Sequence, residues 1–177
     1  THKTNSTDFR IALAKEFQAL ASLRHPNIIP VLDYGFTGDN PYFTMRYIPV
    51  ARTITEVGQQ KSLTGKVNLL IQALRALAYL HRRGIVHRDM KPENALVDID
   101  GHLTLLDFGL AEENPQGAVD GKIVGTLAYI APEVLQGNPP TQAADLFAIG
   151  IMAYEIFMGK HPFDNGTPAD LVTAVLK

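Results

Sequence analysis

Apolar positions in the first third of the chain predict a helix followed by two strands. Within residues 8–23, apolar side chains recur at spacings of four and three, which is typical of an amphipathic helix. These side chains are Leu13, Phe17 and Leu20. The runs 28–34 and 42–48 have the length and composition of strands, and turn-forming residues at 38–41 separate them. Residues 49–52 are interpreted as a linker.

The rest of the chain predicts two long helices with short strands between them. The first helix begins at Thr64 and ends at 82–84, where two arginines precede a glycine. Its apolar positions are Leu63, Val67, Leu70, Leu74 and Leu77. Strand-like pieces follow at 85–87, 95–98 and 102–106. The second helix, 143–158, is apolar on nearly all sides and is predicted to be a buried core element.

Composition narrows the class of protein. The chain has 177 residues, of which 46% are hydrophobic, enough for one core or two small lobes that share one. Sixteen Lys and Arg against 18 Asp and Glu give a net charge of −2, which argues against nucleic acid or an anionic membrane as partner. The absence of cysteine excludes a disulfide scaffold, a cysteine nucleophile and a zinc ribbon, and favours a cytoplasmic location. No membrane segment is expected, because the longest apolar stretch is short and carries two acidic residues.

Polar residues near the middle of the chain carry the chemistry. Asp89, Lys91 and Asn94 lie within six positions, and Asp107 follows after a short predicted hairpin. Carboxylate and amide oxygens beside a lysine suit Mg²⁺ and a polyphosphate. Phosphoryl transfer needs positioning, charge neutralisation and an acceptor for the proton of the nucleophile. Three histidines without clustered partners are expected to be structural rather than metal ligands. These are His81, His102 and His161.

Several motifs in order resemble one family. The run HRDMKPEN (87–94) precedes DFG (107–109), and GTLAYIAPE (125–133) precedes DLFAIG (145–150). Upstream, LRHPNI (23–28) is similar to the junction after a regulatory helix. Together they resemble the catalytic domain of eukaryotic-type (Hanks-type) serine/threonine protein kinases over nearly the whole chain.

The resemblance implies an α+β, protein-kinase-like fold of two lobes. Residues 1–48 would form part of the N-lobe, with an incomplete sheet, and 46–52 the hinge. Residues 53–177 would form a mainly helical C-lobe that lacks its last helices. The resemblance also implies ATP and Mg²⁺ as cofactors, a protein substrate with a Ser or Thr acceptor, and a larger multidomain protein.

Roles in phosphoryl transfer are also implied by the resemblance. Asp89 would accept or orient the proton of the substrate hydroxyl. Lys91 would neutralise the transferred phosphate, and it is typical of serine/threonine rather than tyrosine kinases. Asn94 and Asp107 would bind magnesium, and Thr126 would bridge Asp89 and Lys91.

The resemblance also implies which residues would bind the nucleotide. Met45 would be the gatekeeper, and the backbone of 46–48, including Arg46 and Ile48, would bond the adenine edge. Glu16 would be the regulatory-helix glutamate, although the helix pattern alone favours a carboxylate at the edge of the apolar stripe. Three further residues would form a hydrophobic spine, which is also ordinary core packing. They are Leu20, His87 and Phe108.

Departures from the family pattern leave alternatives open. No Gly-rich phosphate loop precedes the hinge, Lys3 is a weak candidate for the strand lysine, and no arginine follows Arg88 to pair with Glu133. A piece of an active kinase explains these departures, and we expect residues 1–177 alone to turn over little or no ATP. A pseudokinase or scaffold that binds partners is the alternative, and the intact catalytic residues argue against it. A small-molecule phosphotransferase is a third reading, which the complete 125–133 segment disfavours.

The loop between Gly109 and Gly125 contains no Ser, Thr or Tyr, so the usual phosphorylation switch has no acceptor there. One hypothesis is that Asp120 pairs with Arg88 and orders the loop. The competing interpretation is that Arg88 meets only solvent or backbone.

Overall fold

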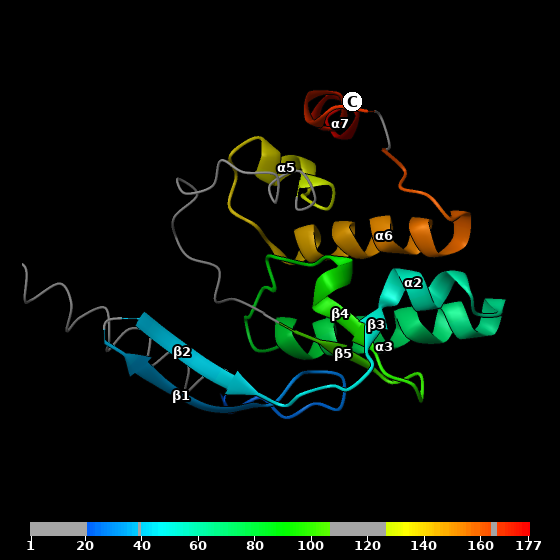
Figure 1. Cartoon of the computed structure of the whole chain (residues 1–177). Helices are drawn as coiled ribbons and strands as arrows, with labels where there is room; N and C mark the ends of the chain where they lie inside the picture. Colours follow the sequence, from blue (N-terminus) through cyan, green and yellow to red (C-terminus); the bar gives the residue numbers. More distant parts are fainter. Residues whose placement is uncertain (1–20, 39, 107–126, 164–165) are drawn as a thin grey trace, which may run out of the picture.

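The computed structural model describes residues 21–38, 40–106, 127–163 and 166–177, as two small sheets and a set of helices (Figure 1). Strands β1 (Val31–Thr37) and β2 (Asn40–Met45) form an antiparallel hairpin. Strands β3 (Arg52–Thr53), β4 (Ala95–Val97) and β5 (Leu103–Leu105) form an antiparallel sheet in that order. The helices are α2 (Ile54–Gln59), α3 (Leu63–His81), the 3-10 turn η1 (Pro92–Asn94), α5 (Pro132–Leu135), α6 (Gln142–Met158) and α7 (Pro168–Val175).

Polar caps explain where the long helices begin. The Ser62 hydroxyl accepts the amide of Gly65 before α3, and the Thr141 hydroxyl accepts the amide of Ala143 before α6. Helix α6 ends at Gly159, whose φ of 74° is the left-handed conformation that glycine adopts without strain. The predicted helices 64–84 and 143–158 are therefore confirmed, with small shifts at their ends.

Other sequence expectations change. Residues 85–87 form no strand, because their backbone follows the end of α3 into a loop. Residues 49–52 end in β3, and α2 begins directly after it behind a Thr53 and Glu56 capping box. The short helices α2, α5 and α7 were not predicted, since each offers too few turns for a clear apolar period. The predicted helix 8–23 falls almost entirely outside the described residues.

The core forms where α2, α3 and α6 meet the β3–β5 sheet. Helix α6 lies beside α2 and α3 (Figure 1), and fully buried side chains come from all three helices and from the sheet. The largest are Ile54, Leu77, Leu80, Leu103, Leu105, Met152 and Ile156. Gly58 permits the close approach of α2 to α6, because a Cβ there would lie 2.9 Å from the Ile156 side chain.

The buried face of α3 differs from the predicted stripe. Leu77 is buried as expected, but Leu63 is 70% exposed, and Val67 and Leu74 are also exposed. The core side of α3 is lined instead by Leu69, Ala73, Ala76, Leu77 and Leu80. Small alanines allow α6 and the sheet to approach the helix, so packing selects this face rather than the one with the most leucines.

A polar network joins the segment before β1 to α3 and β5. The buried Asn27 donates from Nδ2 to Gln72 Oε1 (3.0 Å) and to the Leu103 carbonyl (2.7 Å). Gln72 Oε1 also accepts the Leu103 amide (2.8 Å), and its Nε2 donates to the Gly101 carbonyl (3.2 Å). Gln72 thus ties the middle of α3 to two segments that are distant in sequence.

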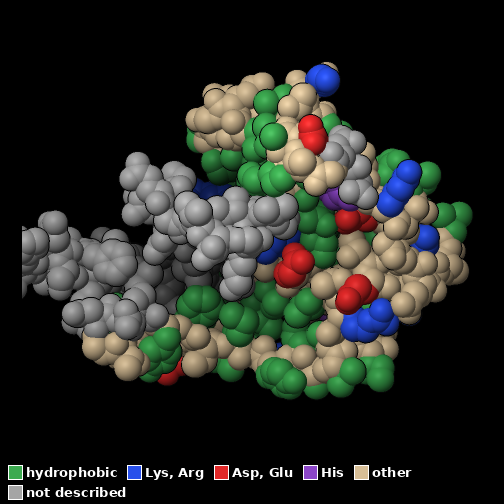
Figure 2. Space-filling view, turned by 45° about the horizontal axis from the view of Figure 1, so that its top comes forward, with side chains coloured by type: hydrophobic (Ala, Val, Ile, Leu, Met, Phe, Trp, Pro, Cys, Tyr) green, Lys and Arg blue, Asp and Glu red, His purple; other side chains and the backbone are tan. Residues whose placement is uncertain are grey.

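Charge on the face drawn in Figure 2 is mixed: acidic and basic side chains alternate with apolar ones rather than gathering in a patch of one sign. Within the part of the chain that the structure describes, no helix has the length and hydropathy needed to cross a membrane.

We expect Gln72→Ala to lower the free energy of unfolding by about 2–3 kcal/mol, because the Leu103 N–H and one of the two Asn27 Nδ2 hydrogens lose their acceptor. Urea denaturation followed by circular dichroism measures the change. Asn68→Ala, an exposed position of the same helix, is the matched control and should shift stability by less than about 0.5 kcal/mol. Equal effects of the two substitutions would contradict the role of the network.

Candidate active site

The loop 87–94 brings three of the predicted catalytic residues together. Lys91 Nζ lies 2.6 Å from Asp89 Oδ2, and about a quarter of each side chain is exposed. The flanking Met90 and Pro92 are buried and hold the loop against the core. The loop therefore presents a carboxylate and an ammonium group to solvent from a buried base.

Asn94 is the third member and is itself buried. Its Nδ2 donates to the Asp89 carbonyl (2.8 Å) and to Asp89 Oδ2 (2.9 Å), while its backbone carbonyl accepts the Leu106 amide (2.9 Å). Because the amide nitrogen faces Asp89, Oδ1 is left available as an oxygen ligand. The bond from Leu106 ties this loop to the residue that precedes Asp107.

Asp145, at the start of α6, holds the beginning of the 87–94 loop through hydrogen bonds to its backbone. Its carboxylate is 1% exposed and accepts the amides of His87 and Arg88, each at 2.9 Å. His81 Nε2 lies 2.7 Å from Asp145 Oδ2. Arg88 has a φ of 70°, a left-handed conformation that costs a non-glycine residue about 1–2 kcal/mol. Asp145 therefore stabilises a strained backbone directly before Asp89.

His87 is completely buried beneath the loop. Burial lowers the pKa of this imidazole, and the negative charges of Asp145 and Asp89 oppose that effect only in part. The neutral ring is therefore the form that the fold favours. Its predicted core position is confirmed, whereas the two other predicted spine residues, Leu20 and Phe108, lie outside the described residues.

The remaining predicted site residues divide into two groups. The first group lies within the described residues. Met45 is the last residue of β2 and packs, partly buried, against the core. Arg46 and Ile48 follow it, and the Arg46 amide donates to the Pro30 carbonyl (3.3 Å). The second group lies outside the described residues, so the structure does not test it. It comprises Lys3, Glu16, Asp107, Asp120 and Thr126.

Sequence reasoning missed the contact between Tyr129 and Glu155. The Tyr129 hydroxyl donates to Glu155 Oε2 (2.8 Å), joining the 125–133 segment to α6. Burial raises the pKa of the Glu155 carboxyl, and burial together with the charge of Glu155 raises that of the Tyr129 hydroxyl. The one sequence signal for this contact is that Glu155 lies in the nearly all-apolar 143–158 stretch, where a carboxylate needs a hydrogen-bond partner.

The three histidines set aside as structural bond to nearby groups. His102 Nε2 donates to the Pro26 carbonyl (2.8 Å), His161 Nε2 donates to the Ala128 carbonyl (3.0 Å), and His81 meets Asp145 as described. Among the residues that the structure describes, no group of three His, Cys, Asp or Glu side chains could hold a metal ion.

Comparison with known proteins assigns the family. The family model described as "Protein kinase domain" matches residues 1–176. "Probable serine/threonine-protein kinase pknA2" of Bifidobacterium longum is 38% identical over 162 residues, covering 89% of this chain and 21% of that protein. "Aurora/IPL1-related protein kinase 2" of Caenorhabditis briggsae is 34% identical, covering 92% of this chain and 54% of its own length. "Serine/threonine-protein kinase PrkC" of Bacillus subtilis is 32% identical, covering 91% of this chain and 26% of that protein.

The chain belongs to the protein kinase domain family, and its helices and small antiparallel sheets form the α+β fold of that family. It spans between a fifth and about half of the length of these relatives.

We expect Asp145→Asn to destabilise the protein by about 2–4 kcal/mol, since an amide can accept only one of the two N–H groups and turns a donor toward the other. Urea denaturation provides the measurement. Asp100→Asn, at an exposed turn position, is the matched control and should be neutral. Retention of wild-type stability by Asp145→Asn would refute the anchoring role.

We also expect burial of neutral His87 to make stability depend on pH. Folding lowers the pKa of His87 below its ordinary value of 6.5. The contribution of the neutral ring to the free energy of unfolding is therefore fully present above pH 6.5 and is lost progressively as the pH falls below 6.5. The slope reaches at most about 1.4 kcal/mol per pH unit. Urea midpoints at pH 7.5 and 5.5 should therefore differ more in the wild type than in His87→Phe. Parallel pH profiles for the two proteins would contradict this expectation.

Proposed function

We propose that the chain is the catalytic core of an ATP- and Mg²⁺-dependent serine/threonine protein kinase. The observation that carries the proposal is the contact of Asp89 with both Lys91 and Asn94 on a loop held by a buried carboxylate. The relatives' names support protein serine/threonine phosphorylation as the activity class. A larger multidomain protein in the cytoplasm, acting in signalling, is part of the same proposal.

In the proposed reaction the hydroxyl oxygen of a substrate Ser or Thr attacks the γ-phosphorus of ATP. The bond from that phosphorus to the β–γ bridging oxygen breaks, and ADP leaves with the electron pair. Asp89 accepts the hydroxyl proton, and its two neighbours fix the direction of the carboxylate. Lys91, whose Nζ lies 2.6 Å from Asp89 Oδ2, would neutralise the negative charge of the transferred phosphoryl group.

The donor set fits a magnesium ion. Asn94 directs its amide nitrogen to Asp89, so Oδ1 can serve as a ligand, and Asp107 would supply the carboxylate that magnesium prefers. Bound there, the ion would neutralise phosphate charge. The Leu106–Asn94 backbone bond supports the placement of Asp107 beside Asn94.

The division into lobes is part of the proposal. Residues 1–48 would form the N-lobe portion, 46–52 the hinge and 53–177 the C-lobe. Met45 would act as gatekeeper, the backbone of Arg46 to Ile48 would bond adenine, Glu16 would orient the phosphates and Thr126 would steady Asp89 and Lys91. The position of Met45 at the end of β2, against the core, supports this arrangement.

We expect Asp89→Asn to reduce kcat for protein phosphorylation by about a thousandfold or more in the full-length protein, with little change in ATP affinity, because the amide cannot accept the proton. Transfer of radiolabelled phosphate to casein, followed by phosphoamino-acid analysis, measures both rate and acceptor.

Asp33→Asn, on the exposed surface of β1, is the matched control and should leave kcat unchanged. A variant at Asp89 within tenfold of the wild type would remove its proposed role. ATP binding without turnover by the wild type would favour the pseudokinase alternative. Label appearing in sugars or aminoglycosides, but not in casein, would favour a small-molecule phosphotransferase.

A further inference from the structure

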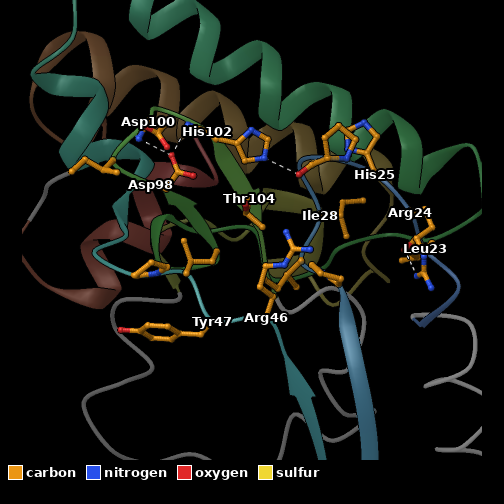
Figure 3. A pocket seen from close by; sticks show the side chains of 16 residues that line it. Leu23, Arg24, His25, Ile28, Arg46, Tyr47, Asp98, Asp100, His102 and Thr104 are labelled. Atoms are coloured by element: carbon orange, nitrogen blue, oxygen red, sulfur yellow. Dashed lines mark hydrogen bonds between the residues drawn. The ribbon is translucent and has the colours of Figure 1, made fainter.

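A cavity of about 590 Å³ borders the 46–49 segment. Three segments line it: residues 23–30, 46–49 and 98–104 (Figure 3). None of Asp89, Lys91 and Asn94 belongs to the lining. The volume lies within the range of pockets that bind small molecules.

Hydrogen bonds hold two walls of the cavity in place. His102 Nε2 donates to the Pro26 carbonyl, and Asn27 Nδ2 donates to the Leu103 carbonyl, so the 23–30 and 98–104 segments are joined directly. Asp98 Oδ1 accepts the amides of Asp100 and His102 and fixes the turn between β4 and β5. Such a cavity binds without a large ordering cost.

Its surface combines apolar groups with one uncommitted cation. Ile28 is buried in the wall, while Ile99 and Tyr47, each more than 80% exposed, lie at the rim. The Arg46 side chain points into the middle of the cavity, toward Thr104 (Figure 3). No side-chain hydrogen bond or ion pair joins its guanidinium to any residue within the described ranges.

The other charges are engaged or lie elsewhere. Arg24 donates to the carbonyls of Ala21 and Leu23. Asp98 is occupied by its turn, and Asp100 is exposed at the tip of that turn. Both aspartates lie toward the opposite end of the cavity from Arg24 (Figure 3). Arg46, an exposed residue, is therefore the lining side chain best placed to bind an anion.

We propose that this cavity binds a small amphiphilic anion, a flat apolar body that carries a carboxylate. The carboxylate would form paired hydrogen bonds with the Arg46 guanidinium, and the apolar body would pack against the exposed Ile99 and Tyr47 at the rim. Because Arg46 also belongs to the segment whose backbone is proposed to bond adenine, occupancy of the cavity would also influence nucleotide binding. That linkage alone rests on the proposed function; the binding site itself does not.

The test uses 2-naphthoate as the probe and ¹H–¹⁵N spectra of the protein without nucleotide. We expect saturable shifts of amides in 23–29, 46–48 and 98–104. The neutral analogue 2-naphthamide and the cation 2-naphthylmethylammonium should each bind about tenfold more weakly, since neither can form a charge-assisted pair with Arg46.

Two variants test the lining. Arg46→Gln should weaken 2-naphthoate binding about tenfold by removing the cation. Ile99→Asp should also weaken 2-naphthoate binding, because it removes an apolar contact and adds a negative charge that repels the carboxylate. Ile99 is 84% exposed, so this variant should keep the fold. Unchanged amide signals elsewhere in the spectrum would verify that the fold is kept. Asn68→Ala, on the exposed face of α3, is the control that should bind normally.

The proposal would be overturned by an absence of saturable shifts, by shifts confined to residues 87–94, by equal binding of the ammonium and carboxylate probes, or by unchanged affinity in Arg46→Gln. A titration with a non-hydrolysable ATP analogue is run separately. If the full-length protein does not bind the ATP analogue but binds 2-naphthoate, the proposed kinase function is removed and the cavity proposal stands.

Discussion

The buried carboxylate of Asp145 is the constraint on which the active-site geometry depends. Placing this charge where it is 1% exposed costs several kcal/mol in lost hydration, which the His87 and Arg88 amides and the His81 ring offset. In return, the carboxylate holds Arg88 in a conformation that it would otherwise avoid. The direction of the chain as it enters Asp89 is thus set by α6, more than fifty residues further along the sequence.

A second set of polar contacts fixes the positions of the proposed catalytic groups. Asn94 holds both the backbone and the carboxylate of Asp89, and Lys91 balances its charge. The bond from Leu106 to Asn94 connects β5 to the same loop, and Gln72 holds β5 from the other side through Leu103. The acidic, basic and amide groups therefore lie on a connected framework rather than on a free loop, as the proposed phosphoryl transfer would require.

Much of the site could be predicted because its members are close in sequence. Asp89, Lys91 and Asn94 lie within one loop, so the short chain between them limits how far apart they can be. The contacts that escaped prediction join distant segments: Gln72 to Asn27 and Leu103, and Tyr129 to Glu155. No local pattern marks them, since a glutamine on a helix or a tyrosine in a loop is equally common on a solvated surface.

The sequence by itself determined the family and the two long helices, and it predicted which loop would be catalytic, because motifs, caps and apolar period are local properties. The tertiary structure decided which face of α3 is buried, since the small Ala73 and Ala76 allow closer packing than the exposed Leu63 and Leu74. It also decided the strained backbone at Arg88 and the cavity beside Arg46. Both arise where segments remote in sequence meet, and their hydrogen bonds and packed volumes exist only after the chain has folded.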